Sequence, residues 1–241
     1  MIAIIIYGPP GAGKGTQAQL LADKLNLIHF DTGRYIRDLI YNSKLKNDKI
    51  ILQERKLNES GQLNTPSWVF KIISDKINEI DRLKKSVVLS GSPRTMIEAF
   101  GDKNKKGLPA GRQGLFEILE KNYGKKNIYI FVLNLSEKES VERNSRRLIC
   151  SQCRLPVLAK VLKSQNFEIK NCLFCGGKLI KRFDDAKKEI IARRFKEYQN
   201  QTVPIVKELE KRKYKVIKIN AASMPFQIHQ KIISWLTPLE V

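Results

Sequence analysis

Four stretches of the chain are predominantly apolar and rich in β-branched residues. They cover residues 2–7, 86–89, 128–133 and 214–219. Runs of successive apolar residues fit parallel strands that are buried on both faces of a sheet better than amphipathic strands. The four runs therefore predict a central parallel sheet.

Apolar residues recur at helical spacing between and after these runs. The expected helices cover residues 16–25, 65–80, 137–148, 186–211 and 225–235. Pro66 and Pro225 fall near two of the expected helix starts, where the missing proline N–H costs no hydrogen bond. Alternation of strands and helices predicts a doubly wound α/β fold.

Two stretches interrupt the alternation. Residues 101–114 contain four glycines and almost no apolar side chain, which predicts an exposed loop insertion. Residues 150–182 contain all four cysteines and short apolar alternations such as residues 156–159. We expect this second stretch to form a small β module inserted into the α/β frame.

The chain is strongly basic. It has 45 Lys and Arg against 24 Asp and Glu, a formal net charge of +21, and 42% of its residues are hydrophobic. The hydrophobic fraction excludes a disordered chain. The charge favours nucleic acid, an anionic membrane surface or phosphorylated small molecules, although many lysines are typical of solvated helix faces. The apolar run at residues 2–7 is too short for a signal peptide or a membrane span, so we expect a cytoplasmic protein with no membrane association.

Residues 8–16 read Gly-Pro-Pro-Gly-Ala-Gly-Lys-Gly-Thr, directly after the first expected strand and at the start of the first expected helix. In this context glycines let several backbone N–H groups converge on one anion, and the lysine ammonium reaches the β and γ phosphates of a nucleotide. Gly15 stands where the general motif has a Ser or Thr that ligates magnesium. The predicted ATP-binding residues of this loop are Gly11, Ala12, Gly13, Lys14, Gly15 and Thr16.

The four cysteines form two Cys-x-x-Cys pairs separated by eighteen residues. The pairs are Cys150 with Cys153 and Cys172 with Cys175. This spacing is typical of a tetrahedral four-thiolate zinc site on two knuckles, and four cysteines are too few for a disulfide scaffold. No fifth ligand or open position is indicated, so we expect a structural zinc ion.

The phosphate loop, followed by Gln17, resembles that of the adenylate kinase family. Further segments resemble the family's motifs in the same order: residues 31–37 (Asp-Thr-Gly-Arg-Tyr-Ile-Arg), 61–63 (Gly-Gln-Leu), 90–95 (Ser-Gly-Ser-Pro-Arg-Thr) and 182–185 (Arg-Phe-Asp-Asp). The resemblance spans nearly the whole chain, with residues 101–114 as an extra segment.

The resemblance implies a P-loop core with two inserts and a phosphotransferase activity. The core would comprise residues 1–31, 65–147 and 186–241, with a helical clamp for the nucleoside monophosphate at residues 32–64 and a zinc-binding lid at residues 148–185. The implied reaction is reversible phosphoryl transfer from ATP to AMP, giving two ADP, with magnesium (Mg2+) bound to ATP. A monomer is expected.

Phosphoryl transfer requires positioning and positive charge rather than covalent chemistry from the protein. The implied catalytic residues are Lys14, Arg94, Arg143, Arg147, Arg182 and Arg194. Arg143 and Arg147 would also bind ATP, because residues four apart on the expected helix share a face. Arg146 is an alternative to Arg147, and Arg193 is an alternative to Arg194.

The resemblance also implies a site for the acceptor. Its residues would be Thr32, Gly33, Arg37, Gly91, Arg94, Glu98, Arg182 and Arg194. Glu98 stands where the family has a glutamine that reads the adenine edge. An ionised glutamate only accepts hydrogen bonds, which suits the adjacent N1–H and N2 amino donors of guanine, so GMP is expected as a second acceptor.

Two aspartates of the family pattern are absent. Arg34 and Ser90 stand in their places, and Ser90 ends the strand beside the phosphate loop, where an acid would hold magnesium-bound waters. Asp31 is a substitute only if it departs from the family's register, because otherwise it would point elsewhere. His29 is expected to be structural.

The alternative to an enzyme is a basic, zinc-containing nucleic-acid binder that has kept the fold and lost efficient catalysis. The cysteine pairs and the net charge of +21 are consistent with it. No aromatic-rich basic stripe accompanies them, and the arginines follow the kinase pattern. The sequence therefore favours the enzyme.

Overall fold

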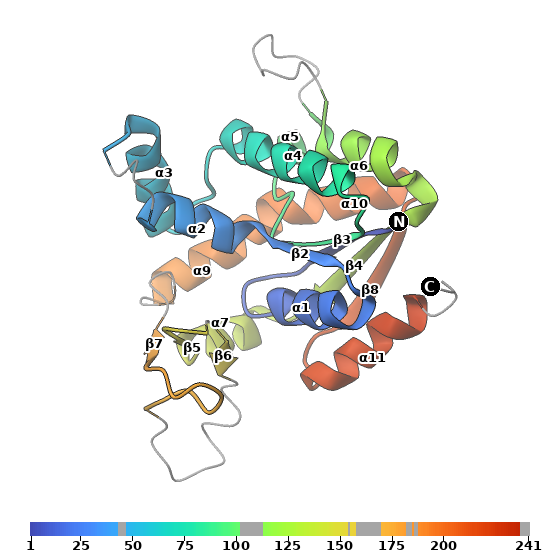
Figure 1. Cartoon of the computed structure of the whole chain (residues 1–241). Coiled ribbons are helices and arrows are strands. Elements are labelled where there is room, and N and C mark those ends of the chain that lie inside the picture. Colours follow the sequence, from blue (N-terminus) through green and yellow to red (C-terminus); the bar gives the residue numbers. More distant parts are fainter. Residues whose placement is uncertain are drawn as a thin grey trace.

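The computed structural model describes residues 1–42, 47–101, 113–153, 155–157, 170–181, 185 and 188–236. Its centre is a five-stranded parallel sheet with strand order β2-β3-β1-β4-β8 (Figure 1). The strands are β1 (Ala3–Tyr7), β2 (Ile28–Asp31), β3 (Val87–Ser90), β4 (Ile128–Asn134) and β8 (Lys215–Asn220).

Helices cover both faces of this sheet, which confirms the doubly wound α/β fold (Figure 1). One face packs against α1 (Lys14–Leu25) and α11 (Pro225–Leu236). The opposite face packs against α4 (Pro66–Arg82), α5 (Met96–Phe100), α6 (Leu115–Tyr123) and α10 (Val203–Lys211). A short 3-10 turn, η1 (Lys125–Asn127), leads into β4.

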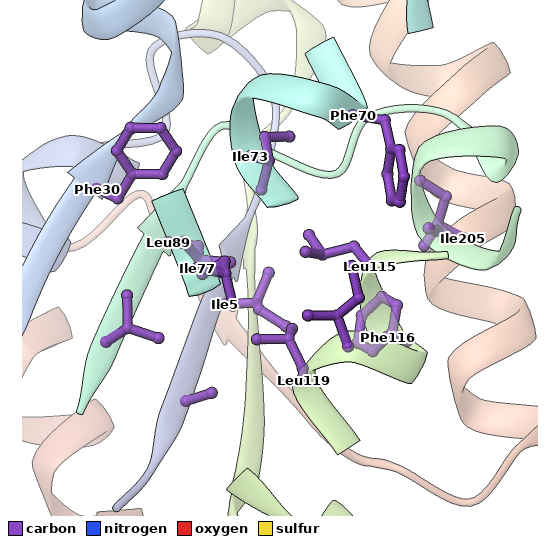
Figure 2. Close-up of a cluster of buried hydrophobic side chains, with 14 of the residues drawn as sticks. Ile5, Phe30, Phe70, Ile73, Ile77, Leu89, Leu115, Phe116, Leu119 and Ile205 are labelled. Carbon is purple, nitrogen blue, oxygen red and sulfur yellow. The ribbon is translucent and has the colours of Figure 1, made fainter. Parts of the chain in front are cut away.

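The hydrophobic core explains the unbroken apolar runs. Ile4 faces the α1 side of the sheet and Ile5 the α4 side, and neither is accessible to solvent. Figure 2 shows the side of the sheet that α4 covers, where Ile5 lies with Leu115 and Phe116 of α6. Since both faces are covered, successive residues of β1 are buried and no polar alternation remains.

The edge strand β2 was not expected from the sequence. It has four residues, two of which are the polar His29 and Asp31, and most of its side chains are only partly buried. Such a short edge strand produces little hydrophobic signal. It matters functionally because its last residue, Asp31, leads directly into α2 (Thr32–Asn42).

The segment after β2 is helical, as the resemblance implied. Figure 1 shows α2 and α3 (Lys49–Glu59) beside the core. The buried carboxylate of Glu54 accepts hydrogen bonds from Asn64 Nδ2 and Thr65 N, both at 2.9 Å, and so fixes α3 to the chain that enters α4. The division of the chain into core, clamp and lid stays a prediction.

The cysteine module is a small antiparallel sheet of order β6-β5-β7, formed by β5 (Leu148–Cys150), β6 (Pro156–Val157) and β7 (Leu179–Lys181). The expected helix at residues 137–148 is too long, because α7 (Glu137–Ser145) ends where the chain turns into β5. Of the predicted alternation at residues 156–159, only the first two residues lie in the described part. A small β module is nonetheless present.

The expected helix at residues 186–211 is divided into three segments. They are α9 (Lys188–Glu197), the π-helical turn η3 (Tyr198–Thr202) and α10 (Val203–Lys211). Pro204 lacks an N–H and cannot continue the α-helical hydrogen bonding, and Val203 N donates to Tyr198 O across the π turn instead. Most of the predicted loop at residues 101–114 lies outside the described residues.

None of the helices described here combines the length and the apolar character that a membrane crossing requires.

Candidate active site

The loop between β1 and α1 depends on two glycines in left-handed backbone conformations. Gly11 has φ 79° and Gly13, the N-cap of α1, has φ 87°. A Cβ on Gly11 would lie 2.7 Å from Asn144 Nδ2, so a side chain there is excluded by contact as well as by strain. A Cβ on Gly13 would meet nothing within 4 Å. The loop therefore leaves the positive end of α1 accessible to an anion.

Lys14 lies at the centre of a group of cations. Its ammonium donates to Gly8 O at 2.8 Å and to Pro9 O at 2.9 Å. Burial holds the pKa of Lys14 well below its usual value, and the positive charges of Arg94, Arg194 and Arg147 lower it further, whereas Asp31 opposes them. A buried ammonium under the influence of three further cations, beside a phosphate loop, is suited to a polyphosphate.

Asp185 joins two of these arginines. Its carboxylate is inaccessible to solvent and accepts from Arg147 Nε at 2.7 Å and from Arg194 Nη1 at 2.7 Å. Both arginine side chains are 18% exposed. One carboxylate orients two guanidinium groups and neutralises only one of them, so the pair keeps a net positive charge for a ligand.

Arg147 reaches the site by a different route from the one predicted. Because α7 ends at Ser145, Arg143 and Arg147 do not share a helix face, and that part of the prediction is wrong. Arg147 follows the helix in a turn closed by its own N–H and Asn144 O, at 3.2 Å. Arg146 points elsewhere and pairs on the surface with Glu142 at 2.8 Å.

Arg143 lies against the phosphate loop. Its guanidinium donates to Gly11 O at 3.4 Å and is held by Glu139 at 2.6 Å. On α9, as after α7, one of the two candidate arginines binds Asp185 and the other lies at the surface. Arg194 binds Asp185 near Lys14, whereas Arg193 is exposed and donates to Ser60 O at 2.9 Å.

The predicted acceptor residues gather at the ends of β2 and β3. A Cβ on Gly33 would lie 3.3 Å from Arg37 Nη1 and 3.6 Å from Arg94 Nη2, so the two guanidinium groups converge there. Arg94 Nε donates to Gly91 O at 2.5 Å. The hydroxyl of Thr32 is buried and has no hydrogen-bond partner within the described residues. Arg182 lies outside the described residues.

Glu98 is 1% exposed and lies in the first turn of α5, whose N-cap is Thr95. Its carboxylate accepts from Arg94 N at 2.8 Å and from the Thr95 hydroxyl at 3.1 Å, while Glu98 N donates to the same hydroxyl. Burial raises the pKa of Glu98 to about 7, although these hydrogen bonds and the charge of Arg94 lower it in part. The carboxyl therefore titrates near neutrality.

Asp31 lies toward the phosphate loop, with its Oδ2 3.8 Å from the position of a Cβ on Gly15. Strands β2 and β3 pair with Asp31 opposite Ser90, so both side chains leave the sheet on the same face. This is the face that α1 covers, since Val88 of β3 packs in the cluster beneath α1. Arg34, at the position of an aspartate in the family pattern, is exposed.

The four cysteine sulfurs lie within 4.8 Å of one another. Cys150 Sγ is 3.4 Å from Cys175 Sγ, and Cys153 Sγ is 3.7 Å from Cys172 Sγ. Thiolates at the usual zinc–sulfur distance of about 2.3 Å in a tetrahedron are about 3.8 Å apart, so the cluster fits a zinc ion. A Cβ on Gly177 would lie 2.8 Å from Cys150 Sγ, which explains the glycine there.

A phosphate loop between the first strand and the first helix of a parallel sheet, with arginines converging on its lysine, defines a P-loop phosphotransferase. The chain also matches the family model described as "Adenylate kinase" over residues 6–214, and it belongs to that family. The predicted activity, phosphoryl transfer between ATP and AMP, is thereby confirmed, and the alternative of a nucleic-acid binder is not supported.

Relatives from several bacteria agree with this assignment. The chain is 31% identical over 221 residues to the adenylate kinase of Petrotoga mobilis, covering 91% of this chain and 90% of that protein. It is 34% identical over 204 residues to the adenylate kinase of Borrelia recurrentis, with 84% and 82% covered. For the adenylate kinase of Chlamydia trachomatis the identity is 29% over 247 residues, with 97% and 89% covered.

Proposed function

We propose that the chain converts ATP and AMP into two ADP through the cation cluster around Lys14, with GMP as a weaker acceptor. The observation that carries the proposal is the placement of arginines at the phosphate loop: Arg143 donates to Gly11 O at 3.4 Å, and Asp185 binds Arg147 and Arg194 at 2.7 Å each. A coupled assay of ADP formation from ATP and each nucleoside monophosphate tests it. Formation of ADP with none of them would exclude the activity.

On the donor side, the backbone of residues 11–16 and the Lys14 ammonium bind the ATP phosphates, while Arg143 and Arg147 take up their negative charge. These groups are held in place before the substrate arrives: Arg143 by Glu139, and Arg147 by Asp185. Preorganised cations lower the barrier because they need no reorganisation as charge moves onto the bridging oxygen.

On the acceptor side, Arg37 and Arg94 hold the phosphate of AMP beside Gly33 and Gly91, and Arg182 and Arg194 contact the transferred group. The hydroxyl of Thr32, which has no hydrogen-bond partner in the described part of the chain, and the carboxyl of Glu98 read the base. Reading a base requires Glu98 to exchange its bond with Arg94 N or the Thr95 hydroxyl for one with the ligand.

Two metals complete the proposal. The four cysteines hold one structural zinc ion, which their mutual distances support. Magnesium bound to ATP would neutralise phosphate charge during transfer. The Thr16 hydroxyl is suited to ligate this ion, and the carboxylate of Asp31, which lies beside Gly15, is suited to accept hydrogen bonds from its waters. A monomeric state and a cytoplasmic location stay predictions.

The paired arginines allow a controlled test of the site. We expect Arg194→Ala to lower kcat at least about tenfold, because it removes a fixed cation beside Lys14, whereas Arg193→Ala changes kcat little. Arg147→Ala and Arg146→Ala form a second pair with the same expectation. Steady-state kinetics on variants with wild-type circular dichroism measures this. Equal effects within each pair would contradict the assignment.

We expect the preference for AMP over GMP to fall as pH rises through about 7, the pKa of Glu98. A protonated carboxyl offers one donor and one acceptor, as adenine N1 and the N6 amino group require, whereas the carboxylate offers acceptors only. The ratio of kcat/KM for AMP to that for GMP, measured from pH 6 to pH 8, reports the change.

The matched control is Glu98→Gln, whose amide donates and accepts at every pH in this range. It should favour AMP and remove the pH dependence of the ratio. The prediction is wrong if GMP is inert and the variant has wild-type kinetics with AMP.

A further inference from the structure

The residue that ends β3 cannot supply negative charge to the phosphate loop. Ser90 is buried and its hydroxyl lies 2.9 Å from His29 Nε2. Gln19 Nε2 donates to Asp23 Oδ1 at 2.8 Å, which directs Gln19 Oε1 toward His29 Nδ1 at 3.0 Å. Burial lowers the pKa of His29, so its ring is neutral, with the proton on Nδ1. The Ser90 hydroxyl therefore donates to His29.

A negative charge is present at the end of the neighbouring strand β2, on Asp31. Asp31 stands opposite Ser90 in the parallel register, and its Oδ2 lies 3.8 Å from the position of a Cβ on Gly15. Its Oδ1 accepts from Arg34 N at 3.0 Å, which fixes the carboxylate. Oδ2 is the oxygen on the side of Gly15 and the start of α1.

Two other acids of the described residues near the loop are bound by arginines. Asp185 is bound by two arginines, and Glu139 is bound by Arg143. The negative charge of Asp31 raises the pKa of Lys14, against the effect of the three arginines. Asp31 therefore interacts electrostatically with the phosphate-binding ammonium. Gly15 adds no side chain between Asp31 and the start of α1.

We infer that Asp31 is the positioning residue that holds the water shell of the magnesium ion bound to ATP, a task moved from the end of β3 to the end of β2. Magnesium keeps several of its waters and is bound in proteins through few carboxylates, so an acid that accepts from those waters orients it. Neighbouring parallel strands are about 4.8 Å apart, a displacement that an outer water shell can span. The inference rests on the proposed binding of ATP at this loop.

Metal binding, rather than turnover, gives the sharpest test. Mn2+ replaces Mg2+ as a paramagnetic probe, and its affinity for the complex of the enzyme with a non-hydrolysable ATP analogue is measured by electron paramagnetic resonance. We expect Asp31→Asn to weaken Mn2+ binding about tenfold or more, the effect typical of losing a group that orients metal-bound ligands. Asp75→Asn, which removes an exposed acid on α4, should have no effect.

Binding of the same analogue in the presence of EDTA separates metal positioning from a structural role. Without metal, Asp31→Asn should bind the analogue as tightly as the wild type or more tightly, because a negative charge beside the phosphates has been removed. The exchange Asp31→Ser with Ser90→Asp should restore most of the Mn2+ affinity, since it returns the carboxylate to the adjacent strand on the same face.

Unchanged Mn2+ affinity in Asp31→Asn would overturn the role of Asp31. So would an affinity for the ATP analogue that falls by the same factor with metal and in EDTA. A wild-type protein that fails to bind the analogue under either condition would instead overturn the proposed function, so the two failures are distinguishable.

Discussion

Replacing Lys14 with alanine is expected to lower kcat by at least about a hundredfold, the cost typical of removing one preorganised group that stabilises transferring charge. The positive charges of Arg94, Arg194 and Arg147 act on this ammonium, which also hydrogen-bonds the loop that would surround the phosphates. Burial and three like charges oppose the positive charge of this ammonium. The charge of Asp31 offsets this opposition in part, and the charge of a bound polyphosphate would offset more of it.

The same reasoning predicts that Lys14→Ala does not lower the thermal unfolding temperature, since the variant loses an opposed charge. The matched control is Lys24→Ala, an exposed lysine in the last turn of the same helix, which should keep wild-type kcat. Coupled assays and thermal denaturation of the three proteins provide the comparison. Wild-type turnover in Lys14→Ala would refute the role of the phosphate loop in catalysis.

Removing zinc is expected to unfold the cysteine module and leave the core folded. The described part of the module has three strands of three, two and three residues, and its knuckle side chains Leu173 and Phe174 are 65% and 80% exposed. So little apolar burial cannot offset the conformational entropy of the segment, and metal–thiolate bonds must supply the stability. The core sheet has its own two buried clusters and does not depend on the metal.

Metal analysis should find about one zinc ion per chain. Hydrogen exchange after chelation, or in Cys150→Ser, should show loss of protection in β5 and β7 with protection retained in β1 and β4. Ser151→Ala, which changes a neighbour of the same knuckle but no thiol, serves as the control. A metal-free protein whose unfolding curve is unaffected by chelation would refute a structural zinc.

The sequence by itself determined the fold class, the family and the placement of the chemistry along the chain. Buried strands and long amphipathic helices have periodicities that report burial directly, so β1, β3, β4 and β8 differ from their predicted limits by one residue at most at either end. The phosphate loop and the paired cysteines could also be predicted from the sequence, because the binding residues of each motif lie close together along the chain. Magnesium and the roles of single residues stay predictions.

Only the tertiary structure decided which side chains face the site. Arg194 rather than Arg193, and Arg147 rather than Arg146, lie near Lys14 because Asp185, distant from Arg147 in sequence, binds one member of each pair. The orientation of Asp31 followed from the parallel register of β2 with β3, and a shift of one residue would have turned it to the other face. Local patterns record how deeply a residue is buried, whereas convergence on one point depends on register and turns between distant segments, which no local pattern contains.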